Sequence, residues 1–214
     1  MTQFAPANEI LRLPSPAPAP QALTFDGEAL WMTSWETQRL YGIQPQRFTV
    51  FEEIDAPGRP IGMVAVGDEL RVVCSEEDDS RFIRRFVPGH GFKSERIACP
   101  DDTGSFLAFD GSRLWLSQRF NQRVLELDAD YGVASELHVD AQIVGIVWIE
   151  DRLYLSTWHG KAGGCKIGRI DRASRAVEYV ASLPFAGISL THDGSRFWTN
   201  DHRGNAVVAF ELRG

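Results

Sequence analysis

The feature that most constrains the fold is an internal repeat with a period of about 42 residues. Five segments align on one apolar anchor each, and the successive anchor spacings are 40, 44, 39 and 44 residues. The anchors are Leu30, Leu70, Leu114, Leu153 and Phe197. A unit of this size cannot bury its own hydrophobic face, so the units must pack against one another. No segment with a helical period competes with the repeat.

Each repeat has the pattern of four short strands. An apolar first strand ends in a tight turn, which is Asp-Gly at residues 26–27, 110–111 and 193–194. Such pairs tolerate the positive φ angles of a two-residue hairpin. An apolar second strand with an aromatic residue, a polar loop, a third strand and a half-exposed fourth strand follow. Four strands every 40–45 residues are typical of a β-propeller blade. We therefore expect an all-β, five-bladed β-propeller of four-stranded antiparallel blades that forms one domain over residues 1–214.

The fifth repeat stops after three strands, whereas the N-terminus carries an unassigned strand, "NEILRL" (8–13). We expect this strand to pair with "AVVAFELRG" (206–214), to complete the last blade and to close the ring. Closure would cover two strand edges that would otherwise be exposed.

Two segments carry a resemblance to known propellers. "LTFDGEALWMTSWETQRLYGI" (23–43) and "LAFDGSRLWLSQRFNQRVLELD" (107–128) resemble blades of the streptogramin-lyase, NHL, YncE-like and glutamine-cyclotransferase-like propellers. The resemblance covers nearly the whole chain. The cyclotransferase likeness implies five blades, whereas the lyase likeness implies seven. These propellers include lyases, cyclases, lactonases and binding modules, so the resemblance implies a fold without selecting a function.

Charge and cysteine content narrow the range of partners. The net charge of −7 argues against nucleic acid or an anionic membrane as the main partner, because either would require a basic face. Arg81, Arg84 and Arg85 have strand-like spacing and are expected to form a solvated edge. The three cysteines show no CxxC spacing, which predicts neither a zinc site nor a disulfide framework. With no signal-like N-terminus, a reduced, cytoplasmic protein is expected.

The loops between second and third strands should surround one mouth of the central channel. They span residues 34–38, 75–80, 117–122, 156–165 and 200–205. The loop at 156–165 is the longest and contains three glycines. A phosphate-binding loop would precede a helix, whereas "CKIGRID" (165–171) is predicted to be a strand, so these glycines indicate a long hairpin loop.

Counting from the anchors predicts which side chains line that mouth. The residues six positions after the anchors are Glu36, Glu76, Phe120, His159 and Arg203. The residues five positions after the anchors are Trp35, Ser75, Arg119, Trp158 and His202. Two carboxylates and two histidines, namely Glu36, Glu76, His159 and His202, could bind a divalent metal or act as acids and bases. They could equally be solvated loop residues.

Four further residues of these loops suggest ligand binding. Trp35 and Trp158 could form a wall for a ring, a sugar or a cation, with Arg119 and Arg203 beside them. Alternatively, the two tryptophans cap the interfaces between blades. A Cys165 nucleophile with His159 as its base is a further hypothesis.

Two functions follow from this pattern. The first is a module that binds a small molecule or a protein partner on the channel-mouth face. The second is a lyase, cyclase or lactone-type hydrolase that acts on a small polar or aromatic metabolite at the mouth, with or without a divalent metal. In the second, Glu36, Glu76, His159 and His202 are the candidate catalytic residues.

Overall fold

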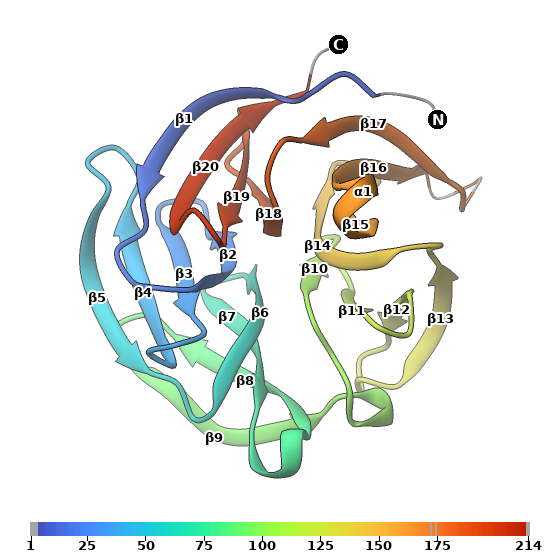
Figure 1. Ribbon diagram of the computed structural model, residues 1–214. Coiled ribbons are helices and arrows are strands. Elements are labelled where there is room, and N and C mark those ends of the chain that lie inside the picture. Colours follow the sequence, from blue (N-terminus) through green and yellow to red (C-terminus); the bar gives the residue numbers. More distant parts are fainter. Residues whose placement is uncertain (1–3, 172, 174, 213–214) are drawn as a thin grey trace.

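The chain forms a ring of five four-stranded antiparallel sheets, so the predicted five-bladed β-propeller is confirmed (Figure 1). This computed structural model describes residues 4–171, 173 and 175–212. Within each of blades 1 to 4 the strands follow one another in chain order from the centre outwards. Each unit of the sequence repeat therefore builds one blade by local hairpins.

The strand bounds are as follows. Blade 1 contains β2 (Pro20–Phe25), β3 (Leu30–Ser34), β4 (Arg39–Gln44) and β5 (Thr49–Asp55). Blade 2 contains β6 (Arg59–Val66), β7 (Glu69–Ser75), β8 (Arg81–Val87) and β9 (Gly91–Ala98). Blade 3 contains β10 (Leu107–Phe109), β11 (Leu114–Gln118), β12 (Arg123–Leu127) and β13 (Val133–His138). Blade 4 contains β14 (Gln142–Ile149), β15 (Arg152–Trp158), β16 (Cys165–Asp171) and β17 (Val177–Leu183). Blade 5 contains β18 (Gly187–His192), β19 (Phe197–Asp201), β20 (Ala206–Glu211) and β1 (Asn8–Pro14).

The N-terminal strand closes the ring, as the sequence predicted. Strand β1 pairs antiparallel with β20, with Leu11 opposite Ala209 and Leu13 opposite Val207 (Figure 1). Arg12 on β1 also donates from Nη1 to Asp201 Oδ2 at 2.8 Å. The closing strand is therefore tied to the end of β19, where a loop of the channel-mouth face begins.

The Asp-Gly turns lie on the opposite face and share one set of hydrogen bonds. In each turn, Oδ1 of the aspartate accepts the backbone N–H groups two and three residues on. The other oxygen accepts the indole N–H of the tryptophan five residues on. The pairs are Trp31 with Asp26 at 2.6 Å, Trp115 with Asp110 at 3.0 Å and Trp198 with Asp193 at 2.7 Å. One carboxylate thus fixes both the turn and a core tryptophan.

The inner strands touch one another at the centre of the ring. Gly62 on β6 lies against the Ser105 carbonyl, and Gly145 on β14 lies against the backbone of β18, so a side chain at either glycine would collide. The Leu23 N–H donates to Ser189 Oγ at 2.9 Å and links blades 1 and 5. Neighbouring blades are therefore joined by close backbone contacts between their inner strands.

Helical structure among the described residues is confined to single turns. They are η1 (Glu77–Asp79), η2 (Pro100–Asp102) and α1 (Gly160–Gly163). The loop at 156–165 is a strand–loop–strand hairpin, as predicted, although its tip contains the short helix α1, which the sequence pattern did not indicate. None of these helical segments has the length and apolar character needed to cross a bilayer.

Candidate functional site

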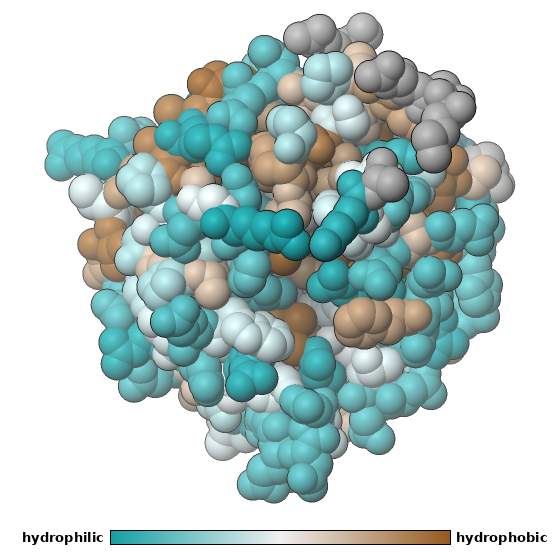
Figure 2. All heavy atoms as spheres, viewed as in Figure 1, coloured by the Kyte–Doolittle hydropathy of each residue, from teal (hydrophilic) through white to brown (hydrophobic). Residues whose placement is uncertain are grey.

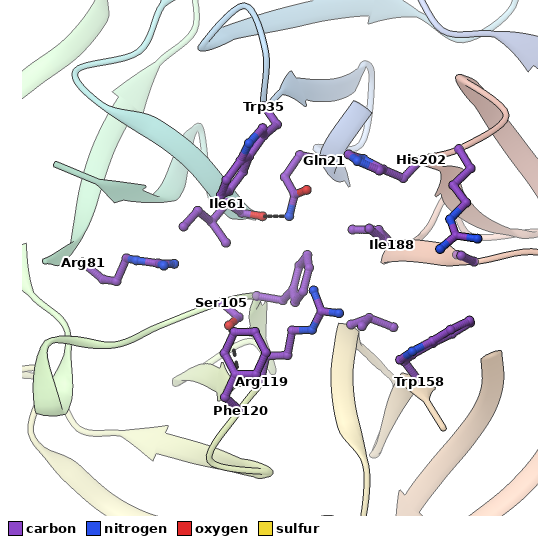
Figure 3. A pocket seen from close by; sticks show the side chains of 15 residues that line it. Gln21, Trp35, Ile61, Arg81, Ser105, Arg119, Phe120, Trp158, Ile188 and His202 are labelled. Atoms are coloured by element: carbon purple, nitrogen blue, oxygen red, sulfur yellow. Dashed lines mark hydrogen bonds between the residues drawn. The ribbon is translucent and has the colours of Figure 1, made fainter. Parts of the chain in front are cut away.

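A pocket at one mouth of the ring takes its floor from irregularities in the inner strands. The pairing of β2, β6, β14 and β18 with their neighbours shifts register at Pro20/Leu23, Pro60/Gly62, Ile143/Gly145 and Ile188/Thr191. Such bulges redirect side chains and often lie beside functional sites. The floor residues that lie in or beside these shifts are Gln21, Ile61, Val144 and Ile188, and Ser105 takes the corresponding place in blade 3. The pocket has a volume of about 420 Å³ (Figure 3).

The walls come mainly from the loops between second and third strands. They contribute Trp35 from blade 1, Arg119 and Phe120 from blade 3, Trp158 from blade 4, and His202 and Arg203 from blade 5. Blade 2 contributes Arg81, the first residue of β8. Viewed towards this face, hydrophobic side chains are recessed near the centre and hydrophilic ones surround them (Figure 2). All five blades therefore contribute to one pocket.

Two arginines of the pocket are held only by neutral groups. Arg119 donates from Nε to Gln142 Oε1 at 3.2 Å, and its guanidinium lies 5.3 Å from the centre of the Phe120 ring. Arg81 donates to the backbone carbonyls of Asp79 and Gly104 at 3.1 and 3.2 Å. Burial lowers the pKa of both side chains, and only for Arg81 does a nearby carboxylate, that of Asp79, partly oppose this effect. Both cations are thus partly desolvated without a direct counter-ion.

None of the described residues that line the pocket carries a carboxylate. These residues include three arginines and one histidine. Among the residues that the structure describes, no carboxylate oxygen forms an ion pair with Arg81, Arg119 or Arg203. The pocket is therefore strongly positive within an acidic protein, and it attracts negative charge.

Aromatic side chains supply much of the wall. Trp35 and Trp158 are half-buried at the ends of their strands, and Phe120 is 76% exposed at the rim. The Arg59 guanidinium lies 4.7 Å from the centre of the Trp35 ring. Trp35 is thereby held in place from outside, and it contributes to the wall of the pocket (Figure 3). Flat apolar surfaces of this kind suit stacking against a ring.

Three polar side chains are oriented by the backbone. The Arg119 N–H donates to Ser105 Oγ at 3.2 Å, which leaves the hydroxyl hydrogen of Ser105 free to donate. His202 Nδ1 lies 3.1 Å from the Pro20 carbonyl oxygen, so this nitrogen carries a proton and Nε2 is the basic nitrogen of the neutral ring. Gln21 donates from Nε2 to the Ile61 carbonyl at 3.3 Å, which fixes its amide (Figure 3).

The eight site residues predicted from the sequence divide into two groups. The pocket brings together Trp35, Arg119, Trp158, His202 and Arg203. Glu36 is an exposed turn residue outside it. Glu76 lies 3.5 Å from both Arg84 and Arg96 in a separate cluster within blade 2. His159 Nε2 lies 2.9 Å from Thr157 Oγ1, and its ring meets the Tyr179 ring edge-on.

The predicted acid–base and metal set is therefore not assembled. Of Glu36, Glu76, His159 and His202, only His202 lines the pocket. In the described part of the chain, no three His, Cys, Asp or Glu side chains are grouped closely enough to hold a metal ion. Burial, with a smaller contribution from Lys166, lowers the pKa of His159.

The hypothesis of a Cys165 nucleophile has no support in the structure. Cys165 is only 1% exposed, and burial raises the pKa of its thiol to about 12. A thiol in this environment stays protonated and inert.

The geometry at the strand ends explains which side chains face the pocket. In blades 1, 3 and 5 the second strand ends before these positions, so the course of the loop decides which side chains face the pocket. Four of the five residues at the fifth position line the pocket, and only Phe120 and Arg203 do so at the sixth.

Arg81 and the residues of the pocket floor were not predicted from the sequence. Arg81 was expected on a solvated edge, but the loop before β8 places it in the pocket. The floor residues had a usable signal, since each lies nine positions before the anchor of its blade. They are Gln21, Ile61, Ser105, Val144 and Ile188.

Comparisons with solved structures confirm the resemblance at the level of the fold. Glutaminyl cyclase from Myxococcus xanthus superposes with a TM-score of 0.75 over the whole of both chains, at 13% sequence identity. Streptogramin B lyase gives 0.59 over 95% of this chain and 87% of that one, at 13% identity. Regucalcin, a calcium-binding protein from Agrobacterium tumefaciens, gives 0.64 over 99% and 96%, at 10% identity. No protein-family profile matches the chain, and no curated protein matches it significantly.

Proposed function

We propose that this protein binds a small organic molecule in the pocket at the channel mouth. The observation that carries the proposal is the convergence of side chains from all five blades on one recess of about 420 Å³. Ligand pockets are of this size, and they combine apolar and aromatic walls with a few oriented polar groups. Here the floor is largely apolar, two tryptophans form walls, and Ser105, Gln21 and His202 are held by hydrogen bonds.

The test is to fill the pocket and to ask whether binding is lost. Ala186 lines the pocket, so Ala186→Trp should occupy it, whereas Ala134→Trp places the same side chain on the exposed outer strand β13. A fragment library is screened by saturation-transfer NMR against the parent protein and both variants. We expect fragments that bind the parent and the Ala134 variant but not the Ala186 variant. Fragments that bind all three equally would contradict a ligand site at this mouth.

An enzyme is the second candidate, and His202 favours it. Among the described lining residues, His202 alone is of a type that commonly acts as an acid or base, and the bond from Nδ1 to Pro20 leaves its Nε2 available. A lyase, cyclase or lactone-type hydrolase would use it to accept a proton.

The first substrate to test is a peptide with N-terminal glutamine, because one similar structure is a glutaminyl cyclase. Cyclisation releases ammonia, which can be measured directly. Ammonia release by the parent that His202→Gln abolishes would establish the enzyme. If binding persists in that variant and neither protein turns the peptide over, the binding module stands and this activity is refuted.

A further inference from the structure

We infer that the pocket selects an organic anion, a carboxylate or phosphate ester carried on a flat ring. The inference rests on the proposed function, because it names the chemical class of the ligand for the same pocket.

The charge of the lining is the first argument. The chain has 29 acidic and 22 basic side chains, yet the described residues of the lining include Arg81, Arg119, Arg203 and His202 and no carboxylate. Elsewhere arginines are paired at short range, as in Arg39 with Glu53, Arg85 with Glu69 and Arg169 with Glu178 at 2.6, 2.7 and 2.8 Å. A buried cation without a partner is costly, so its presence in a recess points to a counter-ion brought by the ligand.

The way the arginines are held is the second argument. Gln142 and the Phe120 ring orient Arg119, and two backbone carbonyls orient Arg81, so both are positioned without being neutralised. They approach the pocket from different blades (Figure 3). Ser105 adds a hydroxyl donor next to Arg119, since its oxygen already accepts the Arg119 N–H. Charged and neutral donors on one recess are the arrangement that binds a carboxylate or phosphate.

The aromatic and apolar part of the lining is the reason to expect a flat ring in the ligand. Trp35 and Trp158 stand on different sides of the pocket (Figure 3). Ile61, Val144 and Ile188 supply its apolar floor. Inorganic phosphate alone would leave this surface unused, whereas a flat ring would cover it and stack on indole. A ring that carries an anionic group engages both halves of the lining.

The test uses matched probes that differ in one property at a time. Benzoate and phenyl phosphate carry a ring and an anion, benzamide carries the ring without charge, and inorganic phosphate carries the charge without a ring. Benzylamine reverses the charge. Binding is measured by saturation-transfer NMR and by indole fluorescence. We expect the Kd of benzoate or phenyl phosphate to be lower than that of benzamide by a factor of about 10 or more, which is the gain that a charged hydrogen bond would give. Benzylamine should bind most weakly.

The matched variants are Arg119→Met and Arg81→Met, with Arg152→Met as the control. Arg152 lies at the start of β15 and is exposed, outside the pocket. We expect each pocket variant to weaken the anionic probes about 10-fold and to leave benzamide unchanged, and the control to bind like the parent. Thermal melts of each variant confirm that it is folded.

The outcomes separate this inference from the proposed function. If benzamide binds in the pocket as tightly as benzoate and phenyl phosphate, or if both arginine variants keep parent affinity for the anions, selection for an anion is refuted while a ligand pocket stands. Tight binding of inorganic phosphate with no gain from the ring refutes the ring. If no probe binds, and if no fragment binds the parent without also binding the Ala186→Trp variant equally, both proposals are refuted.

Discussion

The two faces of the ring are built from the same repeat but differ in how their polar side chains are paired. On the Asp-Gly face, blades 1, 3 and 5 repeat one arrangement, in which an aspartate holds a turn and a tryptophan. On the channel-mouth face, by contrast, the residues five positions after the anchors are Trp35, Ser75, Arg119, Trp158 and His202, so no single arrangement repeats. Among the described residues, Arg81 and Arg119 have no direct counter-ion.

The repeat separates stability from recognition by placing them on different faces of the ring. The hydrogen bonds of the Asp-Gly arrangement join residues two, three and five positions apart, so blades 1, 3 and 5 form them without a partner from another blade. The pocket instead collects groups from five blades and leaves cations unpaired. Residues at the first face should therefore determine the free energy of unfolding, and residues at the second should determine binding. Three measurements test this division.

The largest expected effect is on stability, at an Asp-Gly turn. Asp193 accepts hydrogen bonds from Ser195, Arg196 and the Trp198 indole, so Asp193→Ala should lower the free energy of unfolding by about 2–3 kcal/mol. For a chain of this size that corresponds to a melting temperature lower by roughly 4–12 °C. Urea and thermal unfolding give both values.

The control for this variant is Asp151→Ala. Asp151 occupies the corresponding turn of blade 4, is 78% exposed and only approaches Arg152 at 3.9 Å. We expect this substitution to change the melting temperature by less than about 2 °C. Equal losses in the two variants, or weaker binding of benzoate by the Asp193 variant, would remove the distinction between the faces.

A smaller effect is expected from acid. Burial, the largest single influence, would raise the pKa of Asp110 and of Asp193, but the hydrogen bonds that each accepts outweigh it and lower both to about 2. Because these folded-state values lie below those of the unfolded chain, the stabilisation is complete above about pH 4 and is lost as the pH falls towards 2. We expect a loss of about 1 kcal/mol for each aspartate after allowance for solvent screening.

Urea unfolding at pH 6, 4 and 3 measures this dependence. The Asp193→Ala variant should show a shallower decline over that range than the parent, because one carboxylate whose pKa is lowered by folding is missing. A decline of the same steepness in both proteins would show that other carboxylates control acid unfolding.

The smallest expected effect has the opposite sign and lies at the pocket. Arg119→Met removes a partly buried cation that has no counter-ion, so the free protein should melt at the same temperature or about 1–3 °C higher. Arg123→Met in the same blade removes a cation bonded to Gln118, Asp101 and Glu136, and it should lower the melting temperature. Differential scanning fluorimetry of both variants without ligand checks the contrast. A drop of equal size in both would mean that Arg119 has a structural role.

Much of the fold could be predicted from the sequence. The spacing of the anchors, the Asp-Gly turns and the missing fourth strand of the last repeat together predicted five blades closed by residues 8–13. These features act locally, because a hairpin turn and the strands beside it depend on residues within one repeat. The indole bonds within that repeat, such as the one from Trp31 to Asp26, need no partner from another blade.

The pocket was predictable only in part. Counting from the anchors selected Trp35, Arg119, Trp158, His202 and Arg203, which the structure does place around one recess. The same counting also selected Glu76, but Arg84 and Arg96 flank that carboxylate outside the pocket. A count along the chain gives the height of a residue in its blade, but it does not give the side to which the side chain points.

The repeat in the sequence by itself determined the number of blades, their order and the closure of the ring, because hairpins and period are properties of neighbouring residues. Only the tertiary structure decided which charges are neutralised. Arg81 and Arg119 are more than 35 positions apart, and whether either meets a carboxylate depends on how the blades are brought together. Electrostatic pairing acts across space at a few ångströms, and the sequence does not record those distances.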